Sequence, residues 1–216
     1  MTKWSKRWAE GKTGWHLNSI NAHLQEYHQI LFQNPTPRIL VPLCGRSLDV
    51  AWLAGKGAQV IGIDLVEQPL LGIFTDCAKQ PVQSKVAGLT SLQAGGIQLI
   101  HSDIFSVTRE VIDPVDAIYD RAALVALDPS LRTTYVEHCL SLLRPGGRLL
   151  LLTYDSSADE SSGPPYPVRP GVVEELYAEW STCRCLNSTD TFPDDEDRLQ
   201  RRNLTWMRTT IWEIVK

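Results

Sequence analysis

The sequence lacks any apolar run near the roughly 20 residues that a helix needs to cross a membrane. Residues 1–16, MTKWSKRWAEGKTGWH, are basic and polar, so they also lack the apolar core of a secretory signal peptide. These two absences argue against a membrane span and a secretory leader. We therefore expect a cytoplasmic protein with no membrane partner.

An excess of positive charge is also missing. The chain has 21 Lys and Arg against 25 Asp and Glu, which gives a net charge of −4 at pH 7. Affinity for duplex nucleic acid comes largely from cations that neutralise phosphates. This balance therefore argues against nucleic acid as a partner.

Cysteines are few and odd in number: the five are Cys44, Cys77, Cys139, Cys183 and Cys185. They lie inside apolar patterns or at their ends, which favours reduced thiols over a disulfide framework. No histidine lies near Cys183 and Cys185 in the sequence, so a zinc site at that pair has little support. We expect no metal.

The 216 residues, 43% of them hydrophobic, are enough for one α/β domain with a substantial core. We find no internal repeat and no linker that divides residues 1–216, so we predict a single domain. Nothing in the composition demands an oligomer, and we expect a monomer.

The stretch RILVPLCG, residues 38–45, organises the rest of the chain. Its apolar run is typical of a buried strand in a parallel sheet. Pro42 cannot donate to the ladder, so the strand ends there. Gly45 then permits a sharp turn into a helical pattern over residues 48–56.

A second strand is predicted over residues 59–65, QVIGIDL, with Asp64 at its carboxyl end. A strand, a glycine turn, a helix, a strand and then an acid is the plan of a nucleoside-binding βαβ unit. The acid can accept hydrogen bonds from both ribose hydroxyls. The turn has one glycine rather than the three of a dinucleotide site, which favours a nucleoside without phosphates. The alternative is an ordinary βα turn.

Two further strands end in polar residues. Residues 97–101 lead into Asp103 and Ile104, which suit the amino group and the ring of an adenine, although a helix-cap aspartate is the alternative. Residues 115–120 lead into Arg121, at the sheet edge where ligands bind. The alternative for Arg121 is a structural salt bridge to Asp103 or to Asp120.

The remaining pattern alternates helices with strands. We predict a helix over 19–32 capped by Asn18 or Ser19, a loop over 79–96 and a strand over 148–154. The loop over 155–169 suits a lid or a substrate wall, and the alternative is a surface crossover loop. Further predicted elements are helices over 67–78, 129–143 and 170–180 and an antiparallel strand pair, 182–189 and 204–215, joined by a charged loop over 193–202.

Three tryptophans near the start, Trp4, Trp8 and Trp15, are unusual in so polar a segment. They either staple an N-terminal arm to the core or form an aromatic wall over a flat ligand, and both can hold together.

Several motifs in order resemble the thiopurine S-methyltransferase family over nearly the whole chain. They are Trp8 with Gly11-Lys12-Thr13 and Trp15-His16, then Pro42-Leu43-Cys44-Gly45, then Asp120-Arg121-Ala122-Ala123-Leu124-Val125-Ala126, and then Thr153-Tyr154-Asp155 with Gly163-Pro164-Pro165-Tyr166. The single-glycine turn is the most specific of them.

The resemblance implies a Rossmann-like class I methyltransferase fold, α/β, with a seven-stranded, mostly parallel sheet, helices on both faces and an antiparallel last strand. It implies S-adenosyl-L-methionine as cofactor and methyl transfer to the sulfur or selenium of a small thiol or thiopurine-like acceptor. Residues 1–34 would form an arm and helix that cover the active site.

The resemblance also assigns site residues. The cofactor-binding positions are Trp8, Leu43, Gly45, Asp64, Asp103, Ile104 and Arg121. The acceptor-side positions are Trp15, His16 and Tyr166. It assigns no certain catalytic residue, and Arg121 and Trp15 would position the reactants. Whether Arg198, Arg201 or Arg202 contacts the acceptor stays open.

Two alternatives stay open: a halide/thiol methyltransferase of the same fold, and a non-catalytic S-adenosylmethionine-binding protein. A nucleic-acid or protein N-methyltransferase would carry an Asn/Asp-Pro-Pro-Tyr motif after the fourth strand, where this chain has Asp120-Arg121-Ala122-Ala123.

Overall fold

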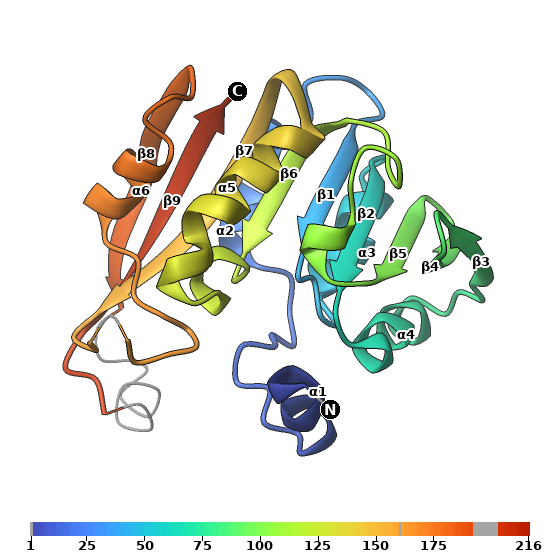
Figure 1. The fold of residues 1–216 in the computed structure, drawn as a ribbon, viewed down its shortest axis with the longest axis horizontal. Helices are drawn as coiled ribbons and strands as arrows, with labels where there is room; N and C mark the ends of the chain where they lie inside the picture. Colours follow the sequence, from blue (N-terminus) through green and yellow to red (C-terminus); the bar gives the residue numbers. More distant parts are fainter. Residues whose placement is uncertain (1, 160, 192–202) are drawn as a thin grey trace.

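The computed structural model describes residues 2–159, 161–191 and 203–216 (Figure 1). Its strands are β1 (Arg38–Pro42), β2 (Gln59–Asp64), β3 (Val82–Val86), β4 (Leu89–Ala94), β5 (Ile97–His101), β6 (Val115–Arg121), β7 (Leu143–Ser156), β8 (Thr182–Thr191) and β9 (Met207–Val215). Within the described residues these strands form one nine-stranded sheet, in the order β3-β4-β5-β2-β1-β6-β7-β9-β8.

The sheet confirms the predicted fold class. Strands β5, β2, β1, β6 and β7 run parallel to one another, whereas the last strand, β9, runs antiparallel to β7 and to β8. The predicted strand number, seven, is too low for the described sheet. The surplus is the hairpin β3–β4, which lies inside residues 79–96, where we predicted a loop. Its first strand is largely exposed, so no apolar alternation marks it.

Apolar residues alternate between two cores, one on each face of the sheet. In β7, Leu149 and Leu151 belong to one core, and Leu150 and Leu152 belong to the other. The first core is closed by helices α5 (Arg132–Leu142) and α6 (Pro170–Leu176), and the second by α2 (Ala22–Tyr27), α3 (Leu48–Gly55) and α4 (Glu67–Asp76). Helices therefore cover both faces, as Figure 1 shows.

The helix predicted over 19–32 begins later and is divided. Asn21, not Asn18 or Ser19, caps α2 by accepting a hydrogen bond from the Leu24 N–H, and the 3₁₀ turn η1 (His28–Leu31) follows. The predicted helix over 129–143 is the 3₁₀ turn η4 (Pro129–Leu131) followed by α5, and α6 ends before the predicted Trp180.

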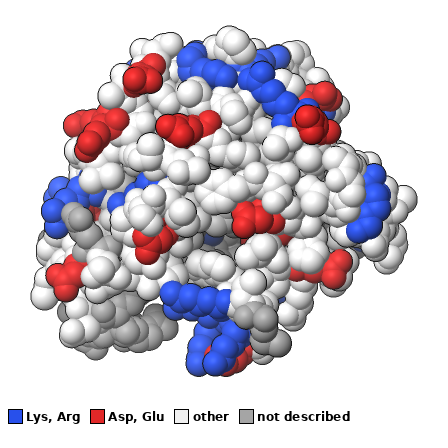
Figure 2. Space-filling model, in the orientation of Figure 1, with Lys and Arg blue, Asp and Glu red and all other residues white. Residues whose placement is uncertain are grey.

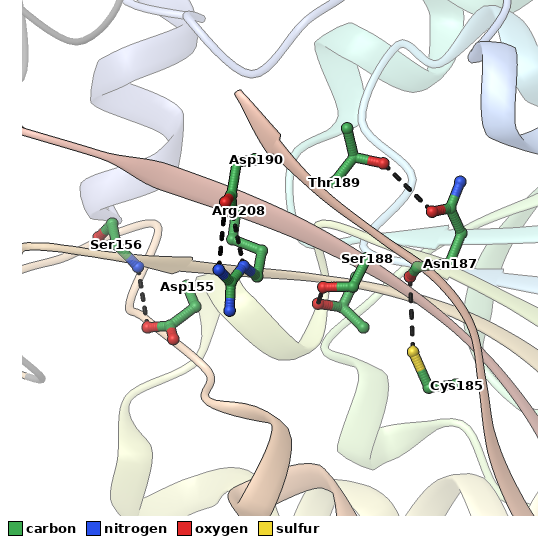
Figure 3. A network of polar contacts seen from close by, with 9 residues as sticks. Asp155, Ser156, Cys185, Asn187, Ser188, Thr189, Asp190 and Arg208 are labelled. Carbon is green, nitrogen blue, oxygen red and sulfur yellow. Dashed lines mark hydrogen bonds and ion pairs between the residues drawn. The ribbon is translucent and has the colours of Figure 1, made fainter. Parts of the chain in front are cut away.

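The predicted antiparallel pair at the sheet edge is confirmed as β8 and β9. Glu213, on β9, is buried and forms ion pairs with Arg148 and Arg184. Figure 3 shows a second pair on the same strands, in which the Arg208 guanidinium binds the Asp190 carboxylate. The charged loop predicted over 193–202 lies outside the described residues.

The N-terminal arm, residues 2–20, contains helix α1 (Lys3–Ala9). In Figure 1 the arm lies beyond the arrowheads of β1, β5 and β6, which mark the carboxyl edge of the parallel strands. Among the described residues, no helix combines the length and the apolar character that a membrane span requires.

Candidate active site

A cavity of about 230 Å³ lies between the carboxyl edge of the sheet and the N-terminal arm. We call it the main cavity. Nine of the predicted site residues line it: Trp8, Trp15, His16, Leu43, Gly45, Asp64, Asp103, Ile104 and Arg121. Tyr166 instead lines a second cavity of about 460 Å³. Trp15, Tyr154, Pro164 and Pro165 line both cavities, so the two adjoin.

The turn after β1 and the acid of β2 are locked together. The Asp64 carboxylate accepts hydrogen bonds from the Gly45 N–H at 2.8 Å and from the Val66 N–H at 2.8 Å. Burial raises the pKa of Asp64, and these two N–H groups act in the opposite direction. A carboxylate has about four acceptor sites, so Asp64 keeps unused lone pairs in the cavity wall.

Gly45 is required by both its backbone and its surroundings. It has φ +53°, and a Cβ placed there would lie 3.1 Å from Cζ2 of Trp8. Leu43, at φ 48°, also occupies the left-handed region, which is uncommon for a residue other than glycine. At Gly45 the turn therefore brings backbone close to the cavity without a side chain in the way.

Gly45→Ala is expected to lower the free energy of unfolding by about 1–2 kcal/mol, because an L-residue in the left-handed region is strained. It should also weaken any ligand in the main cavity, because Trp8 must move. Gly88→Ala is the matched control: Gly88 has φ +83° and open space around it, on the β3–β4 hairpin. Denaturant unfolding should show similar losses of stability in both variants. Ligand titration should show weaker binding only for Gly45→Ala.

Asp103 both caps a turn and lines the main cavity. Its Oδ1 accepts a hydrogen bond from the Phe105 N–H at 3.0 Å, at the start of the 3₁₀ turn η2 (Ile104–Ser106). The capping alternative is therefore confirmed. Ile104 is buried and faces the same cavity, and the adenine contact stays a prediction.

Arg121 does not form the predicted alternative ion pair with Asp103 or Asp120 in the described structure. Its guanidinium donates a hydrogen bond to the Trp15 carbonyl at 2.8 Å, which ties the N-terminal arm to the end of β6. Its Nε is buried and has no hydrogen-bond partner among the described residues. The side chain therefore retains donor capacity at the cavity wall.

Asp120 holds the turn that follows Arg121. This fully buried carboxylate accepts hydrogen bonds from the N–H groups of Ala123 and Leu124 and from the Tyr135 hydroxyl, the last at 2.7 Å. Burial raises the pKa of Asp120 to about 6, although all three donors act in the opposite direction. Ala122, at φ 75°, is kept in the left-handed region by this arrangement.

The tryptophans of the arm pack against one another over the cavity. Trp15 makes edge-to-face contacts with Trp4 at 5.3 Å and with Trp8 at 5.9 Å between ring centroids. These ring contacts lie within the arm, and all three tryptophans line the main cavity, so an aromatic wall over a ligand stays a prediction. Beside them, burial and the charge of Arg46 lower the pKa of His16, so its imidazole is neutral at pH 7.

Our sequence reasoning missed several lining residues, among them Tyr119 and Leu65. Tyr119 could have been found, because it lies two positions before Arg121 on β6 and therefore on the same face. Its hydroxyl donates to buried Asp49, which also accepts from the Asn21 N–H. Arg198, Arg201 and Arg202 lie outside the described residues. Within the described part, no cluster of three or more His, Cys, Asp or Glu is placed to hold a metal ion.

The similarity of this protein to known proteins covers the whole chain. The model of the family described as Thiopurine S-methyltransferase (TPMT) matches residues 1–216. The thiopurine S-methyltransferase of Legionella pneumophila (strain Paris) is 35% identical over 213 residues, which cover 99% of this chain and 96% of that protein. That of Photobacterium profundum is 41% identical over 175 residues, covering 81% of this chain and 80% of that protein.

Solved structures agree on the fold. The 1,6-didemethyltoxoflavin-N1-methyltransferase of Burkholderia thailandensis, solved with S-adenosylhomocysteine, superposes with a TM-score of 0.67 at 16% identity, over 99% of this chain and 85% of that one. The N-methyltransferase NodS of Bradyrhizobium japonicum gives 0.63 at 13% identity, over 93% of this chain and 90% of that one. On the match of the family model and of these relatives over most of its length, the chain belongs to the thiopurine S-methyltransferase family.

Proposed function

We propose that the main cavity binds S-adenosyl-L-methionine through the residues assigned above, and that a small thiol or thiopurine-like acceptor enters beside Trp15. The family defines the reaction as S-adenosylmethionine-dependent methylation of sulfur. The observation that supports this site best is the locked pair of Gly45 and Asp64, which presents a carboxylate and bare backbone at the carboxyl edge of the sheet.

The residues present fit an adenosyl cofactor. Gly45 leaves a space that a Cβ would fill, the turn has no cluster of glycines for a pyrophosphate, and Arg121 Nε is an unused buried donor. Asp64 would accept hydrogen bonds from the ribose hydroxyls. Asp103 and Ile104 would contact the adenine, and Trp8 and Leu43 would pack against the cofactor.

When bound, the cofactor supplies a methyl group on a positively charged sulfur. A thiolate acceptor is negatively charged, so charge disappears as the products form. Trp4, Trp8 and Trp15 would favour that change by excluding water, which stabilises separated charges. We assign the covering role to the N-terminal arm within residues 1–34, because these tryptophans line the cavity.

The acceptor needs little base catalysis, because aromatic thiols have a lower pKa than the cysteine thiol, whose pKa is ~8.5. Arg121 would favour the thiolate form of the acceptor through its charge. Neutral His16 is suited to a structural hydrogen bond rather than to a fixed charge. The main contribution would be alignment of the reactants, which can supply roughly 7–11 kcal/mol.

Calorimetry with S-adenosylhomocysteine, followed by turnover of thiophenol, tests the proposal. We expect saturable one-site binding and methylation of the thiol. Turnover of iodide at a comparable rate would favour the halide/thiol methyltransferase alternative. Binding without turnover of thiols, thiopurines, selenols or iodide would favour a non-catalytic binding protein.

We also propose a cytoplasmic monomer. Support for the compartment comes from the five cysteines, all free and two of them buried in the cores. Sedimentation of the purified protein at several concentrations tests the oligomeric state.

A further inference from the structure

A buried carboxylate behind the main cavity connects three segments of the chain. Asp49 lies in the first turn of α3 and is only 2% exposed. One of its oxygens accepts a hydrogen bond from the Asn21 N–H at 2.9 Å, and the other accepts from the Tyr119 hydroxyl at 3.1 Å. Burial and the charge of Asp49 raise the pKa of Tyr119, so this hydroxyl stays protonated and donates. The proposed function gives the Asp49 carboxylate no role.

Each of the three segments has a part in the proposed site. Helix α3 follows the turn after β1, which lines the main cavity. Tyr119 also lines this cavity and lies on β6 two positions before Arg121, so the two residues are on the same face of the strand. Asn21 is the N-cap of α2 and follows directly on the N-terminal arm. Asp49 therefore joins the root of the arm to two elements that frame the cavity.

The N-terminal arm is thereby tied to β6 at two points. Arg121, at the end of β6, donates directly to the Trp15 carbonyl at 2.8 Å. The root of the arm, at Asn21, is tied to the same strand through Asp49 and the Tyr119 hydroxyl. Two tied points define the path of the arm across the sheet edge, whereas a single point would let the arm swing about it.

We propose that Asp49 is a positioning residue, which sets where the arm, and with it Trp8, lies over the main cavity. A Cβ placed on Gly45 would lie 3.1 Å from Cζ2 of Trp8, so a small shift of the arm changes the surface that meets the turn. Asp49 is not among the lining residues of the cavity and acts through the contacts of Asn21 and Tyr119. This inference rests on the proposed function, in which the arm covers the bound cofactor.

Tyr119→Phe tests the inference, because it removes one of the two hydrogen bonds of Asp49 and keeps the aromatic ring in the cavity wall. We expect S-adenosylhomocysteine to bind about three- to tenfold more weakly, the range that one lost hydrogen bond gives. Calorimetry measures this affinity in the full-length protein.

Trypsin cleavage of the arm gives a second measurement. Lys6 and Lys12 are 70% and 72% exposed, and Figure 2 shows Lys and Arg side chains gathered at the lower edge of the face, where Figure 1 places α1. Cleavage inside a folded segment tracks how often that segment opens. Mass spectrometry should therefore show cleavage at these two sites that is faster by a similar factor in Tyr119→Phe.

Three further variants serve as controls. In Asp49→Asn the side-chain oxygen can accept from the Asn21 N–H and the amide can donate to the Tyr119 oxygen, so most of the affinity and of the protection should remain. Asp49→Ala loses both contacts and should exceed Tyr119→Phe in both measurements. Tyr177→Phe removes a buried hydroxyl that has no hydrogen-bond partner among the described residues and lines neither cavity, and it should change neither measurement.

A double-mutant cycle separates positioning of the arm from a direct effect of Tyr119 on the ligand. If Tyr119→Phe acts by displacing Trp8, adding it to Trp8→Ala should change the affinity for S-adenosylhomocysteine by less than about twofold. The full loss in the Trp8→Ala background would show a direct effect and would overturn the inference.

Wild-type affinity and wild-type protection of the arm in Tyr119→Phe would also overturn the inference, and this variant decides alone if Asp49→Ala does not fold. Either contrary result, with normal S-adenosylhomocysteine binding by the wild type, leaves the proposed function intact. Absence of S-adenosylhomocysteine binding in the wild type would instead refute the proposed function itself.

Discussion

Asp64→Asn is expected to weaken S-adenosylhomocysteine binding by at least about 100-fold. The proposed role gives Asp64 two charge-assisted hydrogen bonds from the ribose, each contributing roughly 1.5–3 kcal/mol. The amide removes the charge. The carboxylate now accepts hydrogen bonds from the backbone N–H groups of Gly45 and Val66, and the amide would turn its own N–H₂ group toward one of them. The turn should therefore become less ordered, and the protein should bind the ligand more weakly.

Two variants make this result interpretable. Asp64→Glu keeps the charge and should retain most of the binding. Asp190→Asn makes the same chemical change in the ion pair with Arg208 at the far edge of the sheet, and should bind like the wild type (Figure 3). Calorimetry gives the affinities, and thermal unfolding of the free proteins reports the loss of the turn. If Asp64→Asn bound within threefold of the wild type, the ribose assignment would be wrong.

The prediction for Asp64 was accessible from the sequence because its signals are local. An apolar run ended by Pro42, a turn that needs Gly45 and an acid at the next strand end each leave a short-range mark. The hairpin β3–β4 leaves none, because its first strand is exposed and has the polar composition of a loop.

Other parts of the site depend on contacts between distant positions. The buried Asp49 carboxylate accepts from the Asn21 N–H, 28 positions away, and from the Tyr119 hydroxyl, 70 positions away. No periodicity in any one segment records such a pairing. The same holds for Arg121 and the Trp15 carbonyl, which together fix where the arm crosses the sheet edge.

The stability of the wild type relative to Asp120→Asn is expected to fall by about 3 kcal/mol as pH rises from about 4 to about 6. Burial raises the pKa of Asp120 from 3.8 to about 6 in the folded protein. Between these values the folded state binds a proton that the unfolded state has released, so the free energy of unfolding decreases with pH. At about 1.36 kcal/mol per pH unit the difference reaches about 3 kcal/mol, and it stays constant above that range.

Urea unfolding of both proteins at pH steps from 4 to 8 measures this difference. Asn keeps the acceptor for the Ala123 and Leu124 N–H groups and does not titrate. Two other carboxyl groups also make stability depend on pH: the pKa of Asp64 is raised, and that of Asp76 is lowered mainly by its hydrogen bond with Arg46. Both groups are present in both proteins, so their contributions cancel in the difference. A pH-independent difference would mean that Asp120 is ionised in the folded protein throughout. The turn that carries Arg121 would then rest on a buried charge held by Tyr135 and two backbone N–H groups, and Tyr135→Phe should become strongly destabilising at neutral pH.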